Sequence, residues 1–329
     1  MVVPSIDDMI SRARGAFLGV AVGDALGATT EFMSPAEIRA QFGVHRRIVG
    51  GGWLHLKPGR VTDDTEMSLC IARAILNSKT WDLKAVAEEF LAWMRGKPAD
   101  IGSTVRRGIR DYLFKEQLET PPNDWDAGNG AVMRMVPVAL YTLGNSQQLQ
   151  ELVIAQAHLT HNHPLSDAAC IATGRMVQAA ILGADRFALH TIARELVAQY
   201  PSFHFKDYRG QASGYVVETL QTVLHFLFTT GSFEECLVGV VNQGGDADTT
   251  GAIAGMIAGA FYGEAAIPSP WLKRLDPTVL REVTEAGVAL VSRSPHFTAA
   301  YREGLFAGGE GDDERRQQGG QLDTNSSGG

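Results

Sequence analysis

Helical periodicity runs through most of this chain and constrains its fold more than any other feature. In the clearest segment, Asp82 precedes a stripe of apolar residues at helical spacing that extends from Leu83 to Met94. Aspartate is a favoured N-cap residue, so we expect a helix to begin directly after it. Alternating runs of β-branched residues, which would indicate strands, are almost absent. The pattern therefore predicts an all-α protein.

The same spacing predicts further helices along the chain. They cover 9–27, 64–78, 103–115, 130–143, 165–183, 187–199, 212–230, 233–242 and 249–262. We expect a compact single-domain bundle of more than ten helices, with little or no sheet. The domain should span 1–305, because no glycine- or proline-rich linker divides this part of the chain. The segment 306–329 is too polar to bury a core, and we expect it to be a disordered tail.

Two of the predicted helices are unusually rich in small residues. They contain the runs from Gly19 to Ala28 and from Gly251 to Ala260. Glycine is a poor helix former, so helix propensity does not explain this composition. Close packing of backbones in a crowded centre does, and we expect these helices to lie there.

Composition excludes several classes of protein. A net charge of −8 argues against a nucleic-acid-binding protein, because phosphate backbones are held by clustered lysine and arginine. Three widely separated cysteines form neither a disulfide framework nor a thiolate metal site. The apolar run 251–261 is shorter than the roughly 20 residues of a membrane span, and no signal peptide is recognisable at residues 1–15. These features predict a cytoplasmic protein, and we expect it to be a monomer.

Two acidic clusters stand directly before predicted helices. The first contains Thr62, Asp63 and Asp64, and the second contains Asp246, Asp248 and Thr249. Helix capping explains either cluster alone, and Asp63 with Glu66 has the spacing of a capping box. Capping requires only one side-chain oxygen, whereas each cluster carries two carboxylates. If the clusters pack together, their charges need a cation between them, and Mg²⁺ or Mn²⁺ prefers such oxygen ligands.

Two loops offer features of a binding site. Asp100 precedes Gly102, Ser103 and Thr104 at the start of a predicted helix, where backbone N–H groups can hold an anion such as a diphosphate. The loop 126–131 contains Asn129 and Gly130 and also leads into a predicted helix, so a ligand can approach its backbone closely. Either loop alone is more often a plain turn.

Three histidines at 158, 161 and 163 lack the spacing of a structural zinc site, and no cysteine lies near them. We expect His161 to line a pocket or to be hydrogen-bonded within its loop. The chain contains no P-loop, no strand-linked G-x-G-x-x-G and no G-x-S-x-G elbow. Nucleoside triphosphatases, dinucleotide-binding folds and serine hydrolases therefore lose their main support.

The order of these motifs resembles the ADP-ribosylglycohydrolase family. The resemblance covers roughly residues 12–290 and rests on GAFLGVAVGDALGATTEF, TDDTEMSL, DAGNGAVMR and GGDADTTGAIAGMIAGA. Several motifs in the same order over most of a chain are far more specific than any one of them. The resemblance implies a compact all-α fold around a central cleft that holds two divalent cations, Mn²⁺ or Mg²⁺.

The resemblance also implies roles for individual residues. The metal ligands correspond to Thr62, Asp63, Asp64, Asp246, Asp248 and Thr249. Asp100 corresponds to the carboxylate that acts as general base, and Glu31 to a glutamate near the metals. Gly102, Ser103 and Thr104 correspond to the diphosphate loop, although many relatives have asparagine in place of Ser103. Tyr215 corresponds to an aromatic residue that stacks on adenine.

The implied reaction is hydrolysis of the N-glycosidic bond between ADP-ribose and an arginine side chain on a protein. The implied substrate is the ADP-ribosylated iron protein of nitrogenase, which the reaction would reactivate. A PII-type signalling protein and, through it, an ammonium channel are implied as partners that recruit the enzyme to the inner membrane. Two alternatives remain open at this point: a phosphohydrolase with two metals, and a non-catalytic module that binds ADP-ribose.

Overall fold

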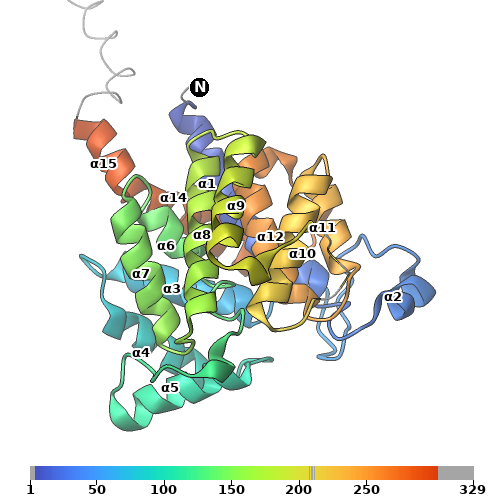
Figure 1. Ribbon diagram of the computed structural model, residues 1–329, viewed down its shortest axis with the longest axis horizontal. Helices are drawn as coiled ribbons and strands as arrows, with labels where there is room; N and C mark the ends of the chain where they lie inside the picture. The colour runs from blue at the N-terminus through green and yellow to red at the C-terminus, as the bar shows by residue number, and fades with distance from the viewer. Residues whose placement is uncertain (1–3, 207, 209, 211, 303–329) are drawn as a thin grey trace, which may run out of the picture.

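The computed structural model describes residues 4–206, 208, 210 and 212–302 (Figure 1). Within these residues the chain forms fifteen α-helices, three short 3₁₀ helices and no β-strand, which confirms the all-α prediction. Their only β-type pairings are two isolated bridges, Gly51 with Leu56 and Gly128 with Tyr215. The predicted tail, 306–329, lies outside the described residues.

The longer helices carry most of the core. They are α1 (Ile6–Gly27), α3 (Asp63–Asn77), α4 (Leu83–Arg95), α5 (Ser103–Lys115), α7 (Ser146–His158), α8 (Pro164–Ile181), α9 (Arg186–Gln199), α10 (Val216–Thr229), α11 (Phe233–Val241), α12 (Ala247–Tyr262) and α14 (Pro277–Ser292). The shorter α-helices are α2 (Pro35–Phe42), α6 (Val136–Tyr141), α13 (Ser269–Leu272) and α15 (Pro295–Arg302). The 3₁₀ helices are η1 (Asp124–Asp126), η2 (Pro201–Phe203) and η3 (Glu264–Ala266).

Helices α1 and α12 form the centre of the molecule and pack closely along their length. A Cβ atom added at Gly19 would overlap the carbonyl oxygen of Gly255, and one added at Gly23 would overlap that of Gly251. Each helix therefore needs glycine at every fourth position of the shared face, because backbone meets backbone there. This contact confirms the prediction that the small-residue helices lie in a crowded centre.

The remaining helices surround this central pair (Figure 1). Helices α8, α10, α11 and α14 pack directly against α1 or α12, and α3 connects the pair to α4 and then α5. The side chain of Asp82 accepts from the backbone N–H of Lys84 at 2.9 Å, so α4 begins where the sequence predicts. None of the described helices is both long enough and apolar enough to cross a membrane.

One helix prediction is wrong over half its length. The periodicity predicts a helix over 130–143, but α6 begins only at Val136. Pro137 explains the late start, because proline has no N–H to donate and is tolerated only in the first helical turn. The preceding residues form tight turns instead, with the N–H groups of Val132 and Met133 both bonded to the carbonyl of Asn129.

Candidate active site

A cleft of about 770 Å³ lies where α1 ends and where α3, α5 and α12 begin. Its volume is within the range of pockets that hold ligands of nucleotide size. It brings together most of the predicted site residues, namely Glu31, Asp63, Asp100, Gly102, Ser103, Thr104, Asn129, Gly130, His161, Asp246, Asp248 and Thr249. Three helix N-termini point their partial positive charges towards this space, which favours anionic groups.

The two acidic clusters meet at the floor of this cleft. Thr62 at the start of α3 lies within hydrogen-bonding distance of Asp64 at 3.0 Å and of Asp248 at 3.3 Å. Thr249 at the start of α12 lies 3.4 Å from the same oxygen of Asp64. Thr62 and Asp64 are fully buried and lie behind the cleft surface rather than on it.

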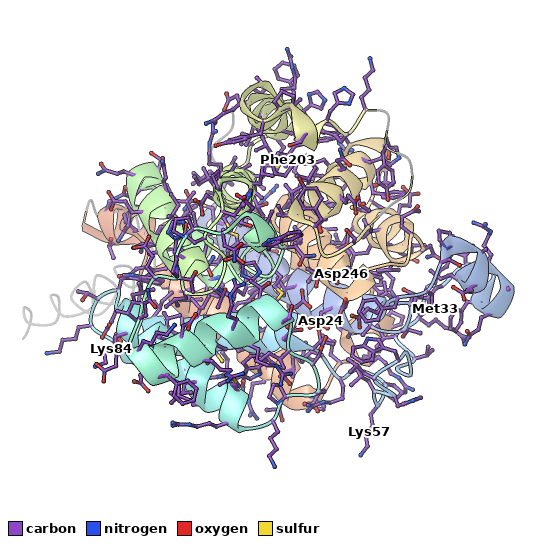
Figure 2. All side chains as sticks on the ribbon, turned by 60° about the horizontal axis from the view of Figure 1, so that its bottom comes forward. Asp24, Met33, Lys57, Lys84, Phe203 and Asp246 are labelled. Atoms are coloured by element: carbon purple, nitrogen blue, oxygen red, sulfur yellow. The ribbon has the colours of Figure 1, made fainter. Side chains whose placement is uncertain are left out.

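Asp24, near the end of α1, also belongs to this acidic site, and the sequence analysis missed it. Its carboxylate accepts from both the N–H and the hydroxyl of Thr62 and of Thr65, at 2.5 to 3.2 Å. Burial raises the pKa of Asp24 to about 6, while these hydrogen bonds act to lower it. Figure 2 labels Asp24 and Asp246 near the middle of the molecule. A single charge inside the apolar run of α1 was the only available signal.

Capping does not account for the acidic clusters. Neither α3 nor α12 has a side-chain hydrogen bond at its N-cap. Glu66, the proposed partner of Asp63 in a capping box, instead accepts from the indole N–H of Trp93 at 2.8 Å. The capping alternative is therefore wrong for both helices, because their carboxylates do not serve as N-caps.

Burial and mutual repulsion favour the protonated form of these carboxyl groups. Burial, followed by the nearby Asp100 and Asp24 charges, raises the pKa of Asp63 to about 8. Burial, followed by the charge of Asp24 on Asp64 and the charge of Asp64 on Asp248, raises the pKa values of these two groups well above the usual range. Acidic groups so close together repel one another strongly unless a cation lies between them.

The hydrogen-bonding capacity of the cluster fits bound cations. The hydroxyl of Thr62 lies within hydrogen-bonding distance of carboxylate oxygens of Asp24, Asp64 and Asp248. Because a hydroxyl has only one hydrogen, it can donate to one of these oxygens at a time. The buried oxygens Oδ1 of Asp64 and Oδ1 of Asp248 have no hydrogen-bond partner among the residues that the structure describes. Leaving a buried carboxylate oxygen without a partner is costly, and such oxygens are the ligands that hard divalent cations prefer. The residues present therefore fit a site for hard divalent cations.

Glu31 and Asp100 reach the same centre from the side of the cleft. Their carboxylate oxygens and one of Asp248 lie within 4.8 Å of one another, close enough to share a metal ion. Burial raises the pKa of Glu31 to about 8, against the effect of a 2.6 Å hydrogen bond from the indole of Trp53. Burial also raises the pKa of Asp100. The sequence analysis missed Trp53, whose ring also packs on the exposed Phe32.

Both predicted loops line the cleft. Gly102, Ser103 and Thr104 begin α5 without a side-chain cap, so their backbone N–H groups remain available to a ligand. In the second loop, the amide of Asn129 donates to Asp246 at 2.7 Å and thus ties this loop to the acidic cluster. Tyr215 does not line the cleft; it is 40% exposed and lies beside it, bridged to Gly128.

The three neighbouring histidines make separate contacts. His158 contacts Glu119 and Asp167, and His163 accepts from the N–H of Leu165 at the start of α8. Only His161 lines the cleft. Burial and the charges of Arg134 and Arg107 lower the pKa of His161 well below its usual value, so the ring is neutral.

The chain belongs to the ADP-ribosylglycohydrolase family, whose model matches residues 5–298. It is thus an enzyme of this family by sequence as well as by its all-helical fold. Among its relatives is the ADP-ribosyl-[dinitrogen reductase] glycohydrolase of Rhodospirillum rubrum, which is 54% identical over 292 residues, covering 89% of this chain and 98% of the relative.

Two further relatives support the assignment. The ADP-ribosylarginine hydrolase Tri1 of Serratia proteamaculans is 32% identical over 285 residues, covering 82% of this chain and 76% of the relative. A solved structure described as an ADP-ribosylglycohydrolase-related protein complex superposes with a TM-score of 0.78 at 32% identity, covering 88% of this chain and all of that one.

Proposed function

We propose that this protein hydrolyses the N-glycosidic bond between ADP-ribose and an arginine side chain, with two divalent cations as cofactors. The observation that carries the proposal is the acidic cluster at the floor of the cleft, with its two unpartnered buried oxygens. The two alternatives, a phosphohydrolase and a non-catalytic binding module, agree less well with the relatives. Those relatives are hydrolases that act on ADP-ribosyl-[dinitrogen reductase] and on ADP-ribosylarginine.

Residues of both clusters would hold the cations. We assign Thr62, Asp63, Asp64, Asp246, Asp248 and Thr249 as the ligands. When bound, the two cations orient the ribose hydroxyls and lower the pKa of a bound water. Asp24 supports these ligands indirectly, because the hydrogen bonds that it accepts hold Thr62 and Thr65 in place.

The side chain of Asp100 acts on the attacking water. Its carboxylate lies at the edge of the cluster and is half-buried, so it can take a proton from a water directed at C1 of the ribose. Glu31, held by Trp53, shares this side of the cleft and orients the same water. Bond cleavage places positive character on the ribose ring, which the surrounding carboxylates stabilise.

The rest of the ligand would extend along the cleft away from the metals. The N-terminus of α5, with Gly102, Ser103 and Thr104, holds the diphosphate. Asn129, Gly130 and His161 line the cleft next to this N-terminus. The exposed ring of Tyr215 beside these residues stacks on the adenine.

The physiological target in this proposal is the ADP-ribosylated iron protein of nitrogenase, which the reaction reactivates. The 54% identity to the enzyme of R. rubrum supports this target. We further propose a cytoplasmic location, with recruitment to the inner membrane through a PII-type signalling protein and the ammonium channel.

The test compares products released from two substrates. We expect the protein to release free ADP-ribose, and to leave unmodified arginine, from ADP-ribosylated nitrogenase iron protein. ADP-ribosyl-arginine as a small molecule should yield the same products. Release from the small molecule alone would contradict the proposed target, and release of AMP in place of ADP-ribose would indicate a phosphohydrolase.

A further inference from the structure

Arg134, on the turn before α6, is a buried cation without a carboxylate partner among the described residues. Its side chain is fully buried, and burial lowers its pKa to about 10. The guanidinium donates to the side chain and the carbonyl of Gln156 at 2.8 and 2.9 Å, and it lies 4.8 Å from the ring centre of Phe90. Burying an arginine is costly, so this placement calls for a role beyond packing.

A third hydrogen bond of Arg134 leads towards the substrate cleft. Its Nη2 donates to the hydroxyl oxygen of Thr160 at 2.8 Å, and that oxygen lies 2.7 Å from Nδ1 of His161. A guanidinium can only donate, so the Thr160 oxygen accepts from it. The chain Arg134–Thr160–His161 therefore has a defined direction at its first link.

The second link follows from where the hydroxyl proton of Thr160 can go. Thr160 is fully buried, and among the described residues Nδ1 of His161 is the only acceptor within reach of its hydroxyl. A proton on Nδ1 would leave this hydroxyl with no acceptor, which is costly in a buried site. The hydroxyl must therefore donate to Nδ1, and the ring of a neutral His161 then carries its proton on Nε2.

His161 lines the cleft, and its Nε2 atom has no hydrogen-bond acceptor in the described part of the chain. The ring occupies the space in front of two glycines. A Cβ atom at Gly128 would lie 3.0 Å from Nε2, and one at Gly130 would lie 2.8 Å from Cε1 and 3.4 Å from a methyl of Val105. Because Val105 is in the first turn of α5, the ring and the start of this helix both lie beside Gly130, next to the proposed diphosphate loop.

We propose that Arg134 and Thr160 are positioning residues that fix His161 as an Nε2–H donor to a diphosphate oxygen of bound ADP-ribose. This inference rests on the proposed function for the identity of the ligand. The buried guanidinium polarises the Thr160 hydroxyl and orients it towards Nδ1, so the donor is set before the ligand arrives. The ligand then meets a neutral donor with a fixed cation behind it.

The first test is spectroscopic and needs no substitution at Arg134 or Thr160. Full-length protein labelled with ¹⁵N-histidine is examined by long-range ¹H–¹⁵N correlation, and the His161→Gln variant identifies the resonances of His161. At neutral pH we expect the shift of an unprotonated nitrogen for Nδ1 and that of a protonated nitrogen for Nε2. A proton on Nδ1 in the unaltered protein would overturn the proposal.

The second test compares two substitutions at Thr160. Thr160→Val removes the hydroxyl at nearly constant shape, and Thr160→Ser retains it. We expect the valine variant to lose the Nε2–H preference and its KM for ADP-ribosyl-arginine to rise about tenfold, with kcat nearly unchanged, since a binding hydrogen bond to a charged group is lost. The serine variant should restore both the tautomer and the KM.

Failure of this inference can be told apart from failure of the proposed function. If unaltered protein releases ADP-ribose but the valine variant keeps the same tautomer and KM, the proposed role of Arg134 and Thr160 is wrong and the proposed function stands. If the unaltered protein releases no ADP-ribose, the function fails. In that case the tautomer measurement still decides whether Arg134 and Thr160 orient His161.

Discussion

At the scale of single residues, the sequence predicts which carboxylates meet but not how each is used. Asp246 and Asp248 were predictable because two carboxylates before a helix exceed what capping needs. Asp24 was not, because one aspartate within an apolar helix has no pattern, and only the fold brings it to Thr62 and Thr65. Tyr215 was predicted by resemblance alone, and its place beside the cleft depends on the bridge to Gly128.

Asp100 provides the sharpest prediction at this scale. Asp100→Asn keeps the size of the side chain but removes the base, so we expect kcat to fall by about 100-fold or more. Metal content after dialysis should be unchanged if Asp100 acts on water alone. Both quantities are measured on the same preparation, by turnover of ADP-ribosyl-arginine and by elemental analysis.

The matched control is Asp111→Asn, on the solvent side of α5, where Asp111 pairs with Lys115. This variant should keep full activity and its metals. Loss of a metal ion in the Asp100 variant would contradict the assignment as base. Its oxygens, within 4.8 Å of Glu31 and Asp248, would then have to be counted as metal ligands.

At the scale of helices, periodicity predicts where most helices lie, because it reflects the face that each one buries. It fails where a local interaction overrides it, as at Pro137, which delays the start of α6. The helices α7 and α14 were not predicted, although Asn145 and Asp276 cap them. The small-residue runs predicted close packing, but the pairing of Gly19 with Gly255 depends on three-dimensional register.

The packing of α1 against α12 leads to a prediction about stability. Gly19→Ala places a methyl group on the carbonyl of Gly255, and backbone atoms cannot move aside as a flexible side chain can. We expect the free energy of unfolding to fall by about 3 kcal/mol, the upper end of the cost of overpacking. Chemical denaturation of both proteins measures this difference.

Gly231→Ala serves as the control for this experiment. Gly231 lies in the exposed loop between α10 and α11, and an added Cβ would meet only the carboxylate of Glu235 at 3.4 Å. Its stability should change little. Equal stability of the two variants would contradict the close packing of α1 and α12.

At the scale of the whole molecule, four helix ends converge on one acidic cleft. The sequence predicts each end separately, but the meeting of two clusters from opposite ends of the chain was an inference from repulsion and resemblance. The structure brings them within hydrogen-bonding distance through Thr62 and Asp248. A protein built in this way should depend on cations for stability as well as for turnover.

Metal-free protein should therefore lose stability as the pH rises. The pKa values of Asp63 and Glu31 are raised from 3.8 and 4.5 to about 8, so the folded state binds more protons than the unfolded state between about pH 4 and pH 8. For each extra proton that the folded state binds, the free energy of unfolding falls by about 1.4 kcal/mol as the pH rises by one unit within this window. The melting temperature of chelator-treated protein should fall accordingly.

Two comparisons complete this experiment. Added Mn²⁺ should restore the melting temperature most at the alkaline end of the window, where the carboxylates are charged. Asp63→Asn should make the pH dependence of the metal-free protein shallower, because one raised carboxyl is gone. A melting temperature that rises with pH in metal-free protein would contradict the account of the cluster.

The central claim is that this cluster binds two cations that the reaction requires. The most direct measurement is a titration of Mn²⁺ into chelator-treated protein, with release of ADP-ribose from an ADP-ribosyl-arginine protein recorded at each step. We predict no release without metal, and a rise that saturates when two ions are bound per chain. Undiminished release from the chelator-treated protein would contradict the claim.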